Sequence, residues 1–219
     1  MKTTVRALTA IGMVLTIAGG AQAGDGYYEV TVTNLTKGQI FSPIIAASHN
    51  ANFSLYTLGA PASAELAAVA QDADASGLKA MLDSSPDVNG MAMGGGLIFP
   101  GQSDTVMLPA MEKSDRISLA SMLVTTNDAF IGLSGAMARK ESMANMMVPA
   151  LDAGSEANSE SCAHIPGPPC GNPFMSPDAA GEGFIHVHNG IHGGSGELDP
   201  AVYDWNTPTA RISVKHVKN

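Results

Sequence analysis

Three histidines stand close together near the C-terminus: His186, His188 and His192, half of the chain's six. Residues 184–188 read Phe-Ile-His-Val-His, a pattern typical of a β-strand, in which alternate side chains point to the same face. An Asn-Gly pair follows and predicts a turn that brings the third histidine back toward the other two. Imidazole nitrogens bind Cu²⁺ and Zn²⁺, so the spacing is compatible with a transition-metal site, although it is less specific than a paired Cys-x-x-Cys motif. The alternative is that these rings only hydrogen-bond to neighbouring loops.

The start of the chain predicts export. Lys2 and Arg6 precede an apolar run over residues 7–18, and Ala-Gln-Ala at 21–23 is the small-residue pattern that a signal peptidase cuts. We therefore expect residues 1–23 to be a signal peptide and residues 24–219 to form one domain in the periplasm or outside the cell. No later stretch approaches the roughly 18 apolar residues of a membrane span.

The charge of the chain limits the classes of partner. The net charge is −9, whereas a nucleic acid or an anionic membrane would need a basic surface. We expect no nucleic-acid partner and no membrane span, and an acidic chain of this kind suits cations such as Ca²⁺.

The two cysteines, Cys162 and Cys170, flank a short Pro-rich segment. In an oxidising compartment a local disulfide between them is the expected state. Two free thiols, or a metal site that includes His164, are the alternatives. The closed loop is short, so the bridge would fix local geometry more than it would stabilise the whole domain.

Most of the chain reads as short β-strands separated by Gly and Pro. Tyr28, Val30 and Val32 alternate with polar residues, as in a strand with one buried face. Similar segments occur at residues 41–48, 117–123, 130–133 and 212–216. This spacing predicts an all-β fold, an antiparallel β-sandwich, in which the first and last strands share one core.

Two stretches interrupt this pattern. Residues 62–71 and 76–82 carry apolar side chains at helical spacing and predict a short helical insertion between strands. Residues 152–178 form a long loop rich in Ser, Pro, Gly and Asn, and a loop of that length in a compact domain is usually functional or mobile.

Several segments, taken in order, resemble the N-terminal spondin domain of F-spondin and mindin, in the form of a stand-alone exported bacterial protein. They are Phe-Ser-Pro-Ile-Ile-Ala-Ala-Ser-His-Asn at 41–50, Thr-Thr-Asn-Asp-Ala-Phe-Ile-Gly-Leu-Ser at 125–134, Leu-Asp-Ala-Gly-Ser-Glu at 151–156, Tyr-Asp-Trp at 203–205 and Ala-Arg-Ile-Ser-Val at 210–214. Together these segments span nearly all of the expected mature chain. Each motif alone is short, and the set carries the resemblance.

The resemblance implies a sandwich related to C2 domains, with long loops at one end that hold a divalent cation. It also implies a non-catalytic role in adhesion or recognition, with a surface protein or a glycan as partner. The family's cation ligands, carried over by position, become Asp128, Asp152 and Glu156. The third is Glu here, where the animal domains usually have Asp, which lengthens that arm.

The acidic residues themselves support calcium, since Ca²⁺ takes roughly six to eight oxygen ligands and carboxylates from neighbouring loops supply them. Oxygen-bearing residues alternate over 152–160. The segment is not an EF-hand, because Ala157 stands where the sharp-turn Gly would be and Ala163 where the bidentate Glu would be. The alternative is a solvated acidic loop.

A second hypothesis is a periplasmic copper- or zinc-binding protein that uses the three clustered histidines, with His49 or His164 as a further ligand. The 13 methionines would suit Cu⁺, but methionine is also a common gap filler in protein cores. An enzyme is not predicted. Gly-Leu-Ser-Gly at 132–135 lacks the spacing of a nucleophile elbow, and no Gly-rich phosphate loop is present in the sequence.

Overall fold

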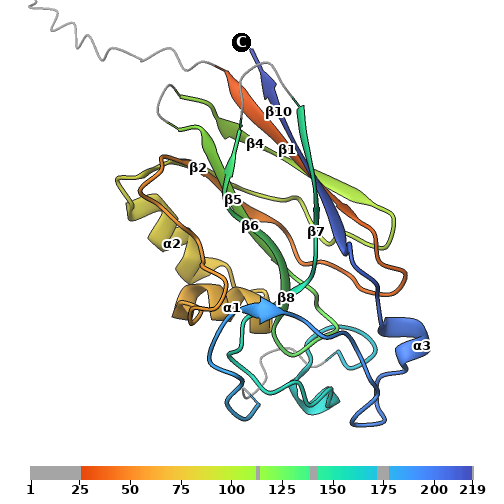
Figure 1. Cartoon of the computed structure of the whole chain (residues 1–219). Helices are drawn as coiled ribbons and strands as arrows, with labels where there is room; N and C mark the ends of the chain where they lie inside the picture. The colour runs from red at the N-terminus through yellow and green to blue at the C-terminus, as the bar shows by residue number, and fades with distance from the viewer. Residues whose placement is uncertain (1–25, 112–113, 139–142, 172–177, 219) are drawn as a thin grey trace, which may run out of the picture.

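Two antiparallel β-sheets pack face to face in the computed structural model, which describes residues 26–111, 114–138, 143–171 and 178–218 (Figure 1). One sheet has the strand order β4-β1-β10-β7, and its strands are β1 (Tyr27–Asn34), β4 (Ser103–Pro109), β7 (Met143–Val148) and β10 (Ala210–Val217). The other has the order β3-β2-β5-β6-β8-β9, and its strands are β2 (Ile45–His49), β3 (Val88–Met93), β5 (Arg116–Met122), β6 (Ala129–Met137), β8 (Leu151–Asp152) and β9 (His186–Val187). The predicted antiparallel sandwich is confirmed.

The first and last strands share one core, as their alternation predicts. β1 pairs with β10 along its whole length, with Val30 opposite Val214 and Val32 opposite Ile212. These side chains are buried in one apolar cluster with residues of β5 and β6 from the facing sheet. The period of two along each strand therefore places one row of apolar side chains between the sheets.

The outer face of the six-stranded sheet is covered by helices α1 (Ala64–Asp72) and α2 (Ser76–Ser84), the predicted helical insertion (Figure 1). The hydroxyl of Ser63 accepts a hydrogen bond from the backbone N–H of Leu66 and caps α1. Leu66 and Phe130 lie in the apolar cluster between the helices and the sheet. Because the first five residues of β6, 129–133, are buried, they form a well-packed support for the turn that precedes them.

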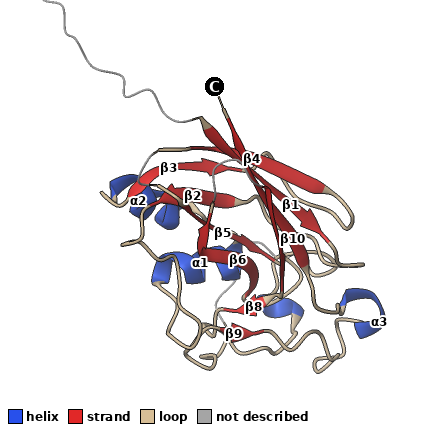
Figure 2. Ribbon diagram, turned by 45° about the horizontal axis from the view of Figure 1, so that its top comes forward, coloured by secondary structure: helices blue, strands red, loops and turns tan. Residues whose placement is uncertain are grey.

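Loops gather at one end of the sandwich, beyond the short strands β8 and β9 (Figure 2). They carry the 3₁₀ turn η1 (Cys162–His164) and the short helix α3 (Pro200–Tyr203). A small apolar cluster of Ile165, Ile191 and Leu198 packs beneath them. Cys162 and Cys170 form the predicted disulfide, with their Cα atoms 4.9 Å apart.

The expected signal peptide, residues 1–23, lies outside the described residues. Within the described part of the chain, no helix is long and apolar enough to cross a membrane.

Candidate metal centre

Asp128 ends the turn between β5 and β6 and connects it to the loop that follows β8. The hydroxyl of Thr126 fixes this turn by accepting from the backbone N–H of Ala129, at 3.0 Å. Asp128 is fully buried, and its Oδ2 accepts three hydrogen bonds, from the N–H of Ser155 (2.7 Å), the hydroxyl of Ser155 (2.9 Å) and the N–H of Glu156 (3.0 Å). The carboxylate therefore holds the two loops together.

Asp152 lies in β8, between the ends of β6 and β9. Its register partners are Ala129 on one side and His186 on the other. The side chain is fully buried: Oδ1 accepts from the N–H of Gly154, and Oδ2 from the side-chain amide of Asn158, both at 2.7 Å. Strand pairing thus brings Asp152 next to His186, which lies more than thirty positions later in the sequence.

The three carboxylates carried over from the resemblance, Asp128, Asp152 and Glu156, are all buried at this end of the sandwich. Burial, and then the neighbouring Asp152, raise the pKa of Asp128 to about 6. Burial and the charge of Asp128 raise the pKa of Glu156 to about 7, and burial also raises the pKa of Asp152. Among the described residues, no lysine or arginine forms an ion pair with them. Negative charge is therefore costly here without a cation.

One carboxylate oxygen of this group is unpaired among the described residues. Asp128 Oδ1 is buried and makes no hydrogen bond to any residue that the structure describes. A buried acceptor without a partner costs about 1–3 kcal/mol, and more when it is charged. A bound cation would satisfy this oxygen and balance the charge of its neighbours.

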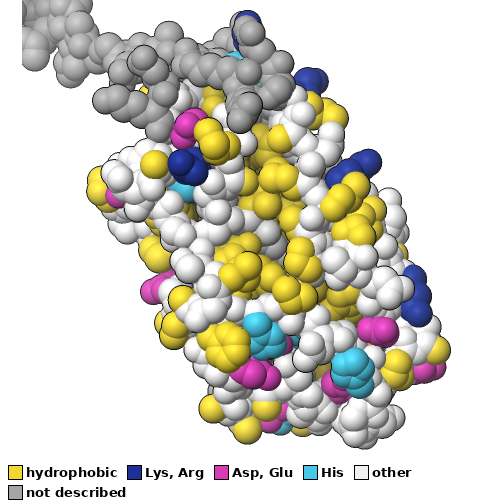
Figure 3. All heavy atoms as spheres, viewed as in Figure 1, with side chains coloured by type: hydrophobic (Ala, Val, Ile, Leu, Met, Phe, Trp, Pro, Cys, Tyr) yellow, Lys and Arg dark blue, Asp and Glu magenta, His cyan; other side chains and the backbone are white. Residues whose placement is uncertain are grey.

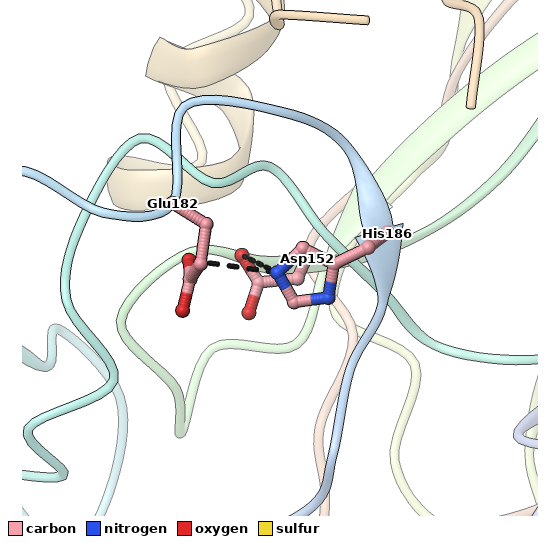
Figure 4. A group of neighbouring side chains, drawn as sticks. All are labelled: Asp152, Glu182 and His186. Carbon is pink, nitrogen blue, oxygen red and sulfur yellow. Dashed lines mark ion pairs between the residues drawn. The ribbon is translucent and has the colours of Figure 1, made fainter. Parts of the chain in front are cut away.

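His186 and Glu182 approach Asp152 from the segment around β9 (Figure 4). One potential ligand atom from each of the three residues lies within 4.8 Å of the others. His186 Nε2 is 3.8 Å from Asp152 Oδ1 and 3.5 Å from Glu182 Oε2. Histidine and acidic side chains lie side by side on the surface at this end (Figure 3). This group could hold a metal ion.

The hydrogen bonds of His186 determine which nitrogen faces the carboxylates. Nδ1 lies 2.9 Å from the carbonyl oxygen of Val187, so Nδ1 carries a proton and donates it. Burial alone would lower the pKa of His186, but this hydrogen bond and the carboxylates of Asp152 and Glu182 together raise it. Nε2 is directed at the two carboxylates.

His188 has a different role, because both of its ring nitrogens are used. Nδ1 accepts from the N–H of Gly190 at 2.9 Å, so Nε2 carries the proton and donates to Asn158 Oδ1 at 3.0 Å. The Asn158 amide in turn donates to Asp152. Burial lowers the pKa of His188 to about 4, which keeps the ring neutral, and it packs against Trp205 with ring centroids 5.2 Å apart. His188 therefore orients Asp152 through Asn158.

His192 does not join the other two histidines, contrary to the prediction from the Asn-Gly turn. Its side chain is exposed, and its backbone N–H donates to Glu160 Oε1 at 2.6 Å. Glu160 Oε2 accepts from the N–H of Gly194, so this carboxylate holds the segment by its backbone and leaves the ring in solvent. The other two histidines considered from the sequence also lie outside the group around Asp152: His49 bonds to Ser118, and His164 is 3.8 Å from Asp178.

Two residues of the site were not predicted from the sequence. Glu182 lies four positions before His186, and Asn158 lies two positions after Glu156. Asn158 belongs to the run of alternating oxygen-bearing residues over 152–160, but its contact with Asp152 was not predicted. The signal for Glu182 was the Glu-x-x-x-His spacing, which is meaningful on a helix, whereas this segment is a loop leading into β9.

Comparison with known protein families places these residues in a wider context. The family model described as Spondin_N matches residues 33–158, more than half of the chain. The chain belongs to the spondin N-terminal domain family. No curated protein matches the chain. In this spondin domain the matched region contains Asp128, Asp152 and Glu156, whereas Glu182 and His186 follow it.

Family membership has two consequences for function. Spondin N-terminal domains are extracellular modules, and the disulfide of this chain agrees with a secreted protein. The family is also generally non-catalytic.

Proposed function

We propose that this spondin domain is an exported, non-catalytic recognition module that binds Ca²⁺ through Asp128, Asp152 and Glu156. The observation that carries the proposal is the burial of three neighbouring carboxylates without a lysine or arginine partner among the described residues. The unpartnered Oδ1 of Asp128 adds a vacant acceptor to the group. All three residues lie within the region matched by the family model.

Calcium suits this part of the site because the donors are oxygens. Ca²⁺ prefers carboxylate and carbonyl oxygens and tolerates irregular geometry, which loops can provide. The side chains come from two loops that Asp128 already connects through Ser155 and Glu156. A cation between them would strengthen that connection and remove the repulsion between like charges.

The cation would act by making the loop end rigid. Loops on a rigid scaffold commonly carry binding residues, and a loop that is ordered before it binds loses less entropy on binding. We propose that the stiffened loops contact a surface protein or a glycan after residues 1–23 have been removed as a signal peptide. The periplasm and the extracellular space are both compatible with this role.

Thermal unfolding of residues 24–219 at increasing calcium concentration tests this proposal. Binding to the folded state alone should raise the melting temperature progressively with calcium. Asp152→Asn should remove most of that rise. The matched control is Asp83→Asn, which changes an exposed carboxylate on α2 that pairs with Lys79, and it should leave the rise intact. An unchanged melting curve up to millimolar calcium would contradict the proposal.

A further inference from the structure

A second set of potential ligands lies beside Asp152 and includes a nitrogen. We propose that Asp152, Glu182 and His186 form a distinct site for a borderline divalent metal ion of the zinc type. The site shares Asp152 with the proposed calcium site, but it takes its other two residues from the segment beyond the family match. The second site therefore has two potential ligands, Glu182 and His186, that the proposed calcium site lacks.

The hydrogen bonding and orientation of the His186 ring suit a metal ligand. Its Nδ1–H donates to the Val187 carbonyl, which fixes the orientation of the ring and directs Nε2 at the carboxylates. Metal-binding histidines usually hold their second nitrogen in this way. In the described part of the chain, Nε2 is buried and has no hydrogen-bond partner.

The two separations from His186 Nε2 to the carboxylates also fit. Around a tetrahedral zinc ion with bonds of about 2.0–2.1 Å, two ligand atoms lie about 3.3 Å apart. The separations of 3.5 and 3.8 Å from His186 Nε2 to Glu182 and Asp152 exceed this by only a few tenths of an ångström. A contraction of this size would bring the three side chains onto one ion. Both separations are also longer than normal hydrogen bonds.

The donor types select the class of metal. Calcium takes oxygen ligands, whereas zinc accepts an imidazole nitrogen together with carboxylate oxygens. Glu182 is 42 % exposed at its side chain, which leaves room for a water molecule as a fourth ligand on the solvent side. This ligand set replaces the predicted three-histidine site, because His188 has no free nitrogen and His192 lies outside the group.

Calorimetric titration of Zn²⁺ into chelator-treated residues 24–219 tests the second site. Wild type should bind zinc at one site, and His186→Ala should weaken binding by at least about tenfold. Glu182→Gln should also weaken it. The matched control is His192→Ala, which removes a nearby exposed histidine and should bind zinc as wild type does.

The two proposals fail in different ways. Asp128→Asn should remove the stabilisation by calcium and keep zinc binding, whereas His186→Ala should do the reverse. A rise in melting temperature with calcium would also show that the His186→Ala variant is folded. If calcium does not stabilise even wild type, circular dichroism provides this folding control. Equal zinc affinity in wild type and His186→Ala, or no zinc binding by wild type, would overturn the second site and leave the calcium proposal standing.

Discussion

Replacing Asp128 with Asn should stabilise the metal-free protein at neutral pH while removing its response to calcium. The substitution keeps the size of the side chain and an acceptor for Ser155 and Glu156, and it removes the charge. Burial and the neighbouring Asp152 raise the pKa of Asp128 from 3.8 to about 6. Since one pKa unit is worth about 1.4 kcal/mol, a rise of this size corresponds to about 3 kcal/mol.

The sign follows from proton binding. A carboxyl group whose pKa is raised by folding binds its proton more tightly in the folded state. The associated stability is complete below the unfolded value of 3.8 and is lost as the pH rises through about 6. At about pH 8, Asp128→Asn should avoid that loss and unfold about 5–10 °C higher than wild type in chelator. Near pH 4 the difference should disappear.

Urea and thermal unfolding of both proteins across this pH range provide the assay. Comparing them at each pH removes the contributions of groups that do not interact with Asp128. His188 keeps a smaller part of its own, because burial lowers its pKa to about 4 in both proteins but the charge of Asp128 raises that pKa only in wild type. Adding calcium should stabilise only wild type and so reduce or reverse the difference. If Asp128→Asn is no more stable than wild type at about pH 8 in chelator, the charge of Asp128 is not costly and the reasoning is wrong.

Three further predictions concern the scaffold. Phe130→Ala should lower the free energy of unfolding, measured by urea denaturation, by about 3–5 kcal/mol, since it leaves a cavity in the core between α1, α2 and the sheet. Gly154→Ala should destabilise the protein and abolish both metal responses, because φ is +64° and the added Cβ would clash with the backbone of Phe184. Gly183→Ala is the control: its φ is +82°, but no atom lies near the added Cβ, so it should cost only backbone strain of about 1 kcal/mol. Replacing Cys162 and Cys170 together with Ser should cost about 2–3 kcal/mol, and reductant should bring wild type to the same urea midpoint.

The long elements of the fold could be predicted from the sequence because their burial follows a regular period. β1 and β10 alternate apolar and polar residues, and α1 repeats its buried residues at helical spacing. The strands β8 and β9 have two residues each, which is too short for any period to appear. Their pairing, which sets Asp152 opposite His186, depends on contacts distant in sequence.

The site was predictable only in part for the same reason. The resemblance named Asp128, Asp152 and Glu156, and all three side chains are buried. The spacing of the histidines predicted that all three rings would be metal ligands, whereas hydrogen bonds to residues distant in sequence place the rings in different environments. Glu160 holds the backbone at His192 from 32 positions away.

His188 also has a hydrogen-bond partner that is distant in sequence. Asn158 bonds to this ring from 30 positions away, and no local pattern reports such a contact. The roles of the individual histidines therefore required the structure.

The most direct test of the central claim is calorimetric titration of Ca²⁺ into chelator-treated residues 24–219. We expect one calcium site per chain, which Asp152→Asn removes and Asp83→Asn keeps. Binding should weaken as the pH falls through about 7 and then about 6, because protons compete for Glu156 and Asp128. Absence of calcium binding up to millimolar concentration, or equal binding by wild type and Asp152→Asn, would contradict the account.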